Sequence, residues 1–433
     1  MVFVRPIEQF APDLMAYRPL LVLWGVTFLA SLVGARRRGG GAVSKQHFCI
    51  LATLSLTVFV SVAINSGVNP AVGAFGVIST PVMLFVLTCL NVDSIDRFRK
   101  LSWVFLASVV ALVFQGLAAY HFGIDSSELV IPQLVSDKIE APKDFPSIPA
   151  EDMSGAFIWR LRSVGFLNDP NDFAQTIVVV APWVLMGFAS DASWLRRLLL
   201  AGPWLATFAY VLSLTHSRGG MLGAGVALLF FFRDRISRKL ALLGGVAAIA
   251  VLAMGMVGGG DRAMSGKEQS ASERIDAWNE GIQMLKGNPV FGVGYDNFTE
   301  HHVRTAHNSF VLCFAELGLL GYFLWMGLIV LAFKALNRIT DTLASTEDHA
   351  RYAVLLRTSM VGFLVCAWFL SRTFVPTLFI LMGMTVGLLH AARQAHPASE
   401  VPELHQPLRW KLTTVNCVVL TLALVSVFIR FSR

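Results

Sequence analysis

The stretch Ser-Leu-Thr-His-Ser-Arg-Gly-Gly, residues 213–220, combines residue types that bind anions. Ser217 is expected to cap the helix that follows, and Arg218 would lie in its first turn. Unpaired backbone N–H groups at a helix N-terminus attract negative charge, and a guanidinium adds bidentate hydrogen bonds to phosphate. An alternative stays open, in which Arg218 only anchors the chain at the membrane interface. Three glycines allow close approach by a helix or a ligand: Gly219, Gly220 and Gly223.

A second polar stretch, Phe-Leu-Asn-Asp-Pro-Asn-Asp-Phe-Ala at 166–174, holds two closely spaced carboxylates. Such a pair could hold a metal ion, but Asp169, Pro170 and Asp172 better fit the N-cap, first and third positions of a helix. We therefore expect a helix start here and no metal. Two arginines just upstream either face an anionic substrate or flank the membrane: Arg160 and Arg162.

A third segment, within residues 258–308, predicts a short amphipathic helix. Ser270 and Glu273 have the spacing of a capping box, and Gly287-Asn288-Pro289 is a stop signal. Arg274 would lie at the beginning of this helix. Four apolar residues would share one face, so the helix is expected to lie on the membrane or against the helical bundle: Ile275, Trp278, Ile282 and Leu285.

A histidine follows this helix at a position suited to acid–base chemistry. Pro-Val-Phe-Gly-Val-Gly-Tyr (289–295) predicts a turn-rich, tightly packed connector, and Ala-His-Asn-Ser-Phe (306–310) places His307 just before a long apolar helix. Histidine titrates near neutral pH, so it can accept a proton from a hydroxyl. A helix cap or a surface position is the alternative. His301 and His302 lie close by, but no thiolate or His-x-x-x-His spacing supports a metal site.

The composition shows what kind of protein must position these residues. Of 433 residues, 55% are hydrophobic and only 15% are charged, and the mean hydropathy is +0.62. Soluble domains carry about 25% charged residues, so this chain could not cover a soluble fold of its size. The same values exclude disorder, and five cysteines that all lie in apolar runs exclude a disulfide-stapled secreted domain.

Apolar runs long enough to cross about 30 Å of hydrocarbon as helices occur about twelve times. Polar residues gather at the ends of these runs, with Glu316 as the main charge inside one. The sequence therefore predicts an all-α polytopic membrane protein with a single helical membrane domain over residues 1–433. The expected spans lie near 19–34, 48–64, 71–90, 101–120, 172–189, 197–214, 219–232, 239–257, 309–333, 353–370, 373–391 and 412–429.

The distribution of basic residues predicts the orientation. More than half of the 35 Lys and Arg residues lie in short loops on one side, whereas the short loops opposite hold only Arg218 and Arg372. The basic side is expected to be cytoplasmic, which makes 121–171 a first and 258–308 a second periplasmic loop. Because the basic residues lie in these loops, the net charge of +7 does not indicate a nucleic-acid partner. Arg430 and Arg433 fit poorly outside, so the helix count at the termini stays open.

Taken together, these segments resemble the O-antigen ligase and polymerase family of bacterial envelope glycosyltransferases. The matching pieces are Leu-Thr-His-Ser-Arg-Gly-Gly, Arg-Ile-Asp-Ala-Trp, Asn-Pro-Val-Phe-Gly-Val-Gly, Ala-His-Asn-Ser-Phe and Ala-Glu-Leu-Gly-Leu-Leu-Gly. Their order and spacing cover residues 213–321, and the stretch at 168–174 is similar as well. The rest of the chain matches only as hydrophobic helices.

The resemblance implies a GT-C-like membrane glycosyltransferase of the bacterial inner membrane, with its active site facing the periplasm. It would transfer a glycan from polyprenyl diphosphate to a glycan or lipid-linked sugar acceptor. By resemblance, Arg218 and Arg274 bind the diphosphate, and His307 activates the acceptor hydroxyl. Arginines can neutralise the leaving group, so no metal or other cofactor is expected, and in-line attack inverts the anomeric centre. Further substrate-binding residues are expected to be Arg160, Arg162, Ser217 and Asn308.

The resemblance leaves three branches of one transferase chemistry open, and a function of another class is a fourth alternative. Ligases transfer a finished glycan to lipopolysaccharide core or another acceptor, whereas polymerases extend a chain by the next repeat unit; both use the same chemistry. A protein O-oligosaccharyltransferase is a third branch. From a different class, a flippase of the same lipid-linked glycan would need a diphosphate-binding arginine but no base. Membrane lipids are expected partners in every case, and nucleic acid in none.

Overall fold

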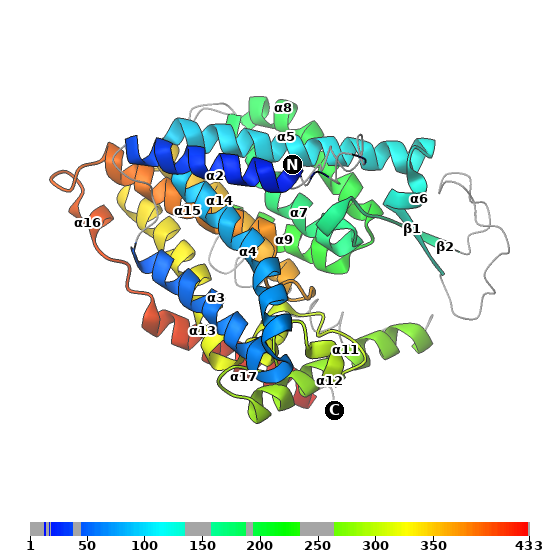
Figure 1. The fold of residues 1–433 in the computed structure, drawn as a ribbon. Helices are drawn as coiled ribbons and strands as arrows, with labels where there is room; N and C mark the ends of the chain where they lie inside the picture. Colours follow the sequence, from blue (N-terminus) through cyan, green and yellow to red (C-terminus); the bar gives the residue numbers. More distant parts are fainter. Residues whose placement is uncertain are drawn as a thin grey trace. The chain divides into compact units, whose positions relative to one another are not determined.

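The structure is a computed structural model that describes residues 13, 17, 19–37, 45–134, 157–187, 194–233 and 264–431. Within them the chain is helical almost throughout, with one two-stranded sheet, which confirms the all-α polytopic prediction (Figure 1). Seven of the described helices are long and apolar enough to cross a membrane: α3 (Lys45–Ser66), α4 (Val68–Asn91), α5 (Ile95–Phe122), α13 (Ser309–Thr342), α14 (Asp348–Ala367), α15 (Pro376–Ala395) and α17 (Lys411–Phe431).

Three further helices account for most of the other expected spans. α2 (Pro19–Arg37), α8 (Trp194–Leu214) and α9 (Arg218–Phe232) lie where spans were predicted, and 239–257 falls outside the described residues. The run 172–189 differs, because α7 (Pro170–Val180) gives way to a 3-10 helix, η4 (Ala181–Gly187). Pro182 lacks the N–H that would continue the α-helical hydrogen bonds, which explains the change.

The chain groups into two compact units. The first comprises Met1–Val26, Lys100–Glu268 and Thr358–Cys366, and the second comprises Thr27–Arg99, Gln269–Arg357 and Ala367–Arg433. Each is described by itself below. The organisation of 1–433 as a single membrane domain stays a prediction.

In the first unit, α7 packs against α9 and α8. A Cβ atom on Gly220 would lie only 2.7 Å from the Cβ of Ala174, and one on Gly223 would meet the Cys366 sulfur and the Gly362 carbonyl. The expected close approach at these glycines is therefore confirmed. The described part of loop 121–171 is ordered as well: it forms α6 (Ser126–Leu129), η3 (Gly165–Leu167) and antiparallel strands β1 (Val130–Leu134) and β2 (Phe157–Leu161).

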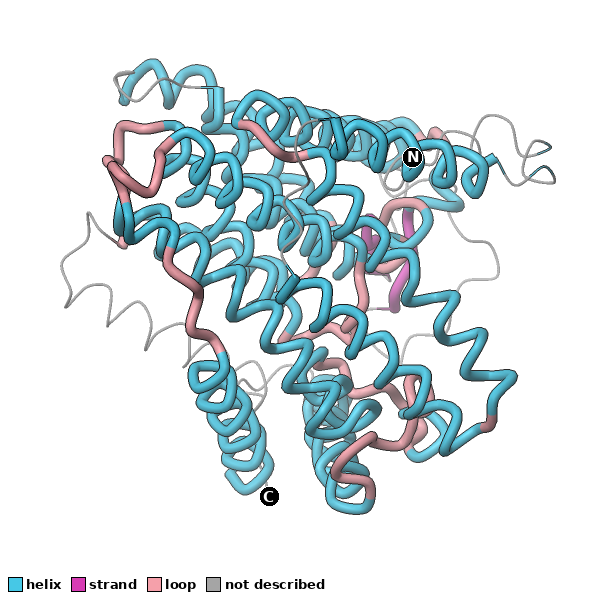
Figure 2. Tube along the Cα trace, turned by 60° about the vertical axis from the view of Figure 1, so that its left-hand side comes forward, coloured by secondary structure: helices cyan, strands magenta, loops and turns pink. Residues whose placement is uncertain are grey.

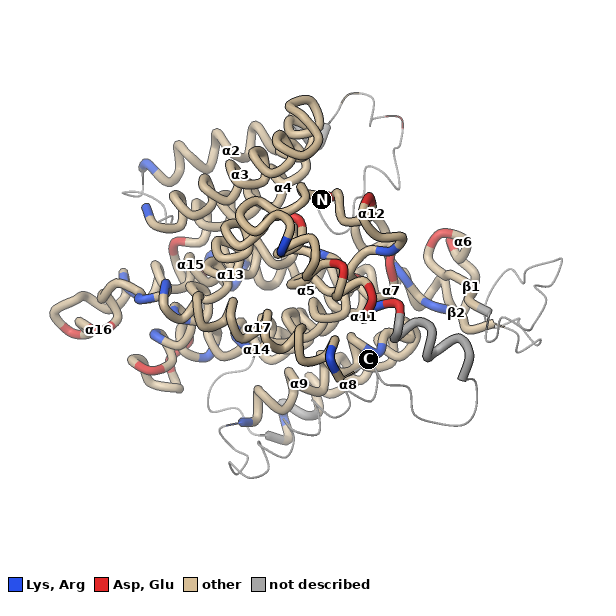
Figure 3. Tube along the Cα trace, turned by 90° about the horizontal axis from the view of Figure 1, so that it is seen from below, with Lys and Arg blue, Asp and Glu red and all other residues tan. Residues whose placement is uncertain are grey.

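In the second unit, α4 packs against α3 and α15, and α13 packs against α3, α15 and α17. Figure 2 shows the described parts of the chain as helices joined by loops, apart from the one small sheet. The charges of α3 and α17 lie only at their ends, and α4 carries none (Figure 3). Apolar helices of this kind have their backbone polar groups paired within the helix, as a hydrocarbon environment requires. The charged residues therefore mark the helix ends and the loops.

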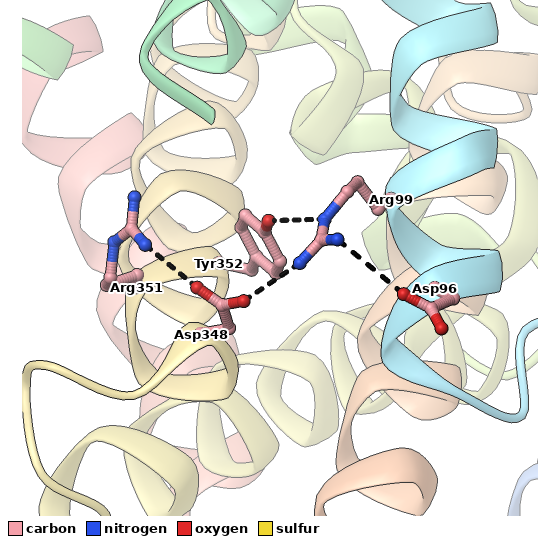
Figure 4. A network of polar contacts seen from close by, with 5 residues as sticks. All are labelled: Asp96, Arg99, Asp348, Arg351 and Tyr352. Atoms are coloured by element: carbon pink, nitrogen blue, oxygen red, sulfur yellow. Dashed lines mark hydrogen bonds and ion pairs between the residues drawn. The ribbon is translucent and has the colours of Figure 1, made fainter. Parts of the chain in front are cut away.

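Basic residues at one set of helix ends pair with carboxylates. Arg99 of α5 lies 2.8 Å from Asp348 of α14 and donates to the Tyr352 hydroxyl at 3.0 Å, while Arg351 lies 2.8 Å from the same Asp348 (Figure 4). Asp96 lies 3.6 Å from Arg99. Single exposed pairs contribute little, but this network joins the first turns of two helices. Arg99 and Arg351 thus join two helices, in addition to the orienting role that the sequence predicts for them.

Candidate functional site

The turn between α8 and α9 places the Ser217–Arg218 pair in the first unit. Ser217 caps α9 by accepting a hydrogen bond from Gly220 N at 3.1 Å, and its own N–H donates to Thr215 Oγ1 at 3.2 Å. Arg218 is the first residue of α9 and is exposed. The predicted cap is confirmed, and the guanidinium lies at the positive end of the helix dipole.

His216, directly before this cap, has a left-handed backbone conformation with φ +49°. A non-glycine residue there stores strain of about 1 kcal/mol or more. Burial and the positive charge of Arg160 lower the pKa of His216. The turn thus presents an exposed imidazole next to the helix start, held in a conformation that the surrounding contacts must enforce.

Arg160 on β2 is one of those contacts. Its Nε donates to the Thr215 carbonyl at 3.1 Å, and its Nη2 donates to Asn171 Oδ1 at 3.3 Å. The pKa of Arg160 is lowered, because the effect of burial outweighs that of the negative charge of Asp169. The structure therefore brings Arg160 to the motif turn, where it positions the main chain; whether it also binds substrate stays a prediction.

Arg162 reaches different main-chain groups. Its Nε donates to the Glu128 carbonyl at 2.6 Å, and its Nη1 lies 3.4 Å from the Asn168 carbonyl. It therefore joins β2 to α6 and to the segment before α7.

The carboxylates near α7 form the predicted helix start. Asp169 is the N-cap and accepts from Asn171 N at 2.7 Å, Pro170 is the first helical residue, and Asp172 is buried in the first turn. In the described residues, the group suited to a metal ion lies elsewhere: the ligand atoms of Glu347, His349 and His396 lie within 4.8 Å of one another. That group is at the start of α14 and the end of α15, and includes none of the motif residues.

In the second unit, α13 is interrupted at Gly318, which has φ +65°. The connector after α11 packs into the break. Leu319 N donates to the Pro289 carbonyl at 2.8 Å, and Gly294 N donates to the Glu316 carbonyl at 3.0 Å. Backbone groups freed by a broken helix at membrane depth need such protein partners. The predicted tightly packed connector is therefore confirmed, and its partner is the broken helix.

Polar residues of α3, which the sequence analysis did not single out, complete this joint. Ser61 Oγ lies 2.9 Å from the Glu316 carbonyl and 2.5 Å from the Phe291 carbonyl, and Asn65 Nδ2 donates to the Gly292 carbonyl at 3.1 Å. Glu316 itself is buried, and its Oε1 accepts from Phe298 N at 3.4 Å. The signal available in the sequence was the pair of polar residues four apart near the end of an apolar run.

Replacing Gly318 by alanine should destabilise the protein strongly. The new Cβ would meet the Val290 main chain, and the positive φ adds a cost of about 1–3 kcal/mol. We expect a lower melting temperature of the purified protein and a proportionate loss of activity. Gly287→Ala is the matched control, because Gly287 ends α11 with open space around its Cβ position. Equal melting temperatures for the two variants would contradict this account of the break.

α11 (Met264–Gly287) confirms part of the predicted amphipathic helix and corrects its start. The helix ends at Gly287 as expected, but it begins at Met264, so the start predicted at Ser270 was wrong. The Ser-x-x-Glu spacing also fits inside a helix, since it places both side chains on one face. Arg274 is consequently an interior residue of α11, half-buried, rather than one in its first turn.

The predicted apolar face of α11 points into the second unit. Ile275, Trp278 and Leu285 are buried and Ile282 is partly buried. A Cβ on Gly281 would lie 2.6 Å from Val311, so the helix lies against α13, one of the two expected placements. Trp278 Nε1 donates to the Ala306 carbonyl at 2.9 Å. α11 thus fixes the residue that precedes His307.

His307 and Asn308 form the entry to α13. His307 is partly buried with φ +46°, the same left-handed conformation as His216. Asn308 is fully buried and caps α13 through Oδ1, which accepts from Phe310 N at 2.9 Å and Val311 N at 3.1 Å. Its Nδ2 has no hydrogen-bond partner in the described part of the chain. A buried, unpaired donor beside a strained histidine is typical of a substrate site.

The predicted site residues therefore form two sets. Arg160, Ser217 and Arg218 lie around one helix start in the first unit, and Arg162 directly follows the strand that carries Arg160. The second set lies in the second unit and consists of Arg274, His307 and Asn308. Arg274 lies on α11, and Trp278 of the same helix holds the Ala306 carbonyl just before His307. In each set a histidine with positive φ precedes the N-cap of a helix.

Comparison with known proteins agrees with the motifs. Residues 204–326 match the family model described as O-antigen ligase. The chain is also 29% identical over 224 residues to the exopolysaccharide production protein ExoQ of Rhizobium meliloti (strain 1021). That match covers 47% of this chain and 48% of the relative, so it spans about half the length of the protein it matches. The resemblance seen in the motifs is therefore confirmed.

Proposed function

We propose that this chain, which resembles the O-antigen ligase and polymerase family, is a membrane glycosyltransferase. Its donor is a glycan linked to polyprenyl diphosphate, and its acceptor is a sugar hydroxyl at the periplasmic face of the bacterial inner membrane. The observation that carries the proposal is the placement of both motif sets at helix starts, with an exposed Arg218 in one and a strained His307 in the other. The match to the O-antigen ligase model over these motifs supports it.

The proposed reaction needs a base and a clamp for negative charge. His307 takes the proton of the acceptor hydroxyl as its oxygen attacks the anomeric carbon. The bond from that carbon to the diphosphate oxygen breaks, and polyprenyl diphosphate leaves with the bonding electrons. Arg218 and Arg274 neutralise the charge that grows on the leaving group, which is the role a metal would otherwise have. Attack from the opposite side inverts the anomeric centre.

The acceptor distinguishes two branches of this chemistry. Transfer to lipopolysaccharide core would make the protein a ligase, as the description of the matching family model suggests. The matching relative is described as an exopolysaccharide production protein, which favours a second candidate, a polymerase that extends an exopolysaccharide. Supplying purified protein with the lipid-linked repeat unit alone separates them, because only a polymerase forms longer chains without another acceptor.

The experiment that tests the proposal uses purified protein in liposomes with a lipid-linked glycan and EDTA present. Formation of a longer or acceptor-joined glycan is expected. Movement of the donor between leaflets without joining would instead identify a flippase. Activity that is lost in EDTA and restored by Mg²⁺ or Mn²⁺ would contradict the metal-free clamp.

The proposed orientation predicts opposite labelling at the two ends of α13. Val303, before α13, is 95% exposed, and Ser345, after it, is also exposed. In a background without the exposed Cys49, a membrane-impermeant thiol reagent should label Val303→Cys in intact spheroplasts. Ser345→Cys should label only after permeabilisation. The reverse pattern would overturn the orientation.

A further inference from the structure

The Ser309 hydroxyl joins the turn between α14 and α15 to the entry of α13. Ser309, two residues after His307, is fully buried. Its Oγ donates to the Leu370 carbonyl at 2.5 Å and accepts from the Arg372 N–H at 3.0 Å. All of these residues belong to the second unit. The main chain on both sides of Ser371 is therefore fixed beside the His307–Asn308 motif.

Two tryptophans support the same turn. Trp325 Nε1 donates to the Thr373 carbonyl at 3.0 Å. The ring of Trp368 lies 5.7 Å from that of Trp278 and 5.5 Å from that of Phe310, measured between centroids. Since Trp278 also holds the Ala306 carbonyl, the residue before His307 and the turn before α15 share one rigid support.

Buried donors without partners gather at this junction. In the described residues, Ser371 Oγ and Asn308 Nδ2 are both buried with no hydrogen-bond partner. Ser371 lies between the two residues that Ser309 contacts, and Asn308 directly precedes Ser309. Leaving a buried donor unpaired costs free energy, so two such donors next to residues that Ser309 joins fit a ligand that accepts hydrogen bonds.

Arg372 supplies a positive charge to the same turn. Its side chain is exposed, and its charge acts on Tyr295 of the connector. Burial, helped by the charges of Glu316 and Asp296, raises the pKa of the Tyr295 phenol to about 12, while Arg372 lowers it. The cation therefore lies near both the connector and the entry to α13.

Arg372 also lies in a loop on the side of the membrane where the sequence predicts few basic residues. The short loops opposite the basic side hold only Arg218 and Arg372. Basic residues on that side weaken the signal that orients a membrane protein, so an arginine there needs another reason to be present. For Arg218, that reason is its proposed role in binding the diphosphate. A guanidinium beside unpaired hydroxyl and amide donors has the chemistry that binds phosphate oxygens.

We propose that the 370–373 turn is part of the donor site and that Arg372 binds an oxygen of the donor's diphosphate. Ser371 Oγ and Asn308 Nδ2 donate hydrogen bonds to the same anionic group. This inference rests on the proposed function and adds a third arginine to it, on the same unit as the proposed base.

The test measures binding of glycan-free undecaprenyl diphosphate to the purified full chain in phosphatidylcholine nanodiscs. A hydrogen bond to a charged group stabilises by about 1.5–3 kcal/mol, so Arg372→Ala should raise the Kd roughly ten- to hundred-fold. Arg372→Lys should recover only part of the affinity, because lysine keeps the charge but loses the planar fork. Ser371→Ala, a smaller change, should weaken binding several-fold. Arg409→Ala is the control, since Arg409 is exposed and precedes α17, outside this turn.

An unchanged Kd in Arg372→Ala, with an unchanged melting temperature, would overturn the inference. A loss of affinity that appears only in anionic nanodiscs would mean that Arg372 binds lipid headgroups, and would overturn it as well. The proposed function fails separately: wild-type protein that binds the diphosphate but never transfers glycan would refute transferase activity and leave Arg372 as a diphosphate ligand.

Discussion

His307→Ala should lower the turnover of glycan transfer by roughly 10²–10⁴-fold, the usual contribution of a general base. The acceptor hydroxyl would then have to lose its proton to water during the attack. The donor KM should change little, because the proposed contact of the imidazole is with the acceptor. The substitution leaves the cap of α13 in place, since Asn308, not His307, caps this helix. Steady-state kinetics with purified protein measure both parameters.

The control for this variant is His301→Ala. His301 is exposed, lies in the same segment and is not expected to touch substrate. Its turnover should equal that of the wild-type protein. A folded His307→Ala protein that transfers glycan at the wild-type rate would remove the base from the scheme. The remaining arginines would then fit a flippase better than a transferase.

Arg218→Ala should raise the donor KM and lower turnover together. Its charge is proposed to meet the diphosphate before and during bond cleavage, so both the ground state and the transition state lose a contact. Loss of a charge-assisted contact of about 1.5–3 kcal/mol corresponds to roughly ten- to hundred-fold in kcat/KM, and more if the charge on the leaving group grows during cleavage. Arg218→Lys should recover only part of this loss.

Arg233→Ala is the matched control, because Arg233 lies at the opposite end of α9, over the ring of Phe230. It should retain wild-type kinetics. If Arg218→Ala changed only the melting temperature and left the donor KM unaltered, its role would be structural. The different kinetic signatures of Arg218 and His307 make the two roles separable.

Local features of both motif sets could be predicted from the sequence. Ser217, Asp169 and the stop at Gly287 depend on hydrogen bonds to residues a few positions away, and each is confirmed. The buried face of α11 follows from helical periodicity in the same way. The start of α11 was wrong because a Ser-x-x-Glu spacing occurs inside helices as well as at their beginnings.

Features that depend on distant residues could not be predicted. The break of α13 at Gly318 is stable only because Pro289 and Val290 return to it, and Ser61 of α3 completes the joint. The residues near Gly318 in the sequence do not predict this break, since an isolated glycine is also tolerated within a helix. The contact of Ser309 with the turn at Arg372 spans 63 residues and has no local pattern either.

The most direct measurement of the central claim is the product formed by purified wild-type protein from a lipid-linked glycan of known anomeric configuration, in EDTA. NMR of the product gives the configuration of the new glycosidic bond, and mass spectrometry gives the released lipid. The account predicts one new bond of inverted configuration for each polyprenyl diphosphate released. A product of retained configuration, or release of the lipid without any new glycosidic bond, would contradict it.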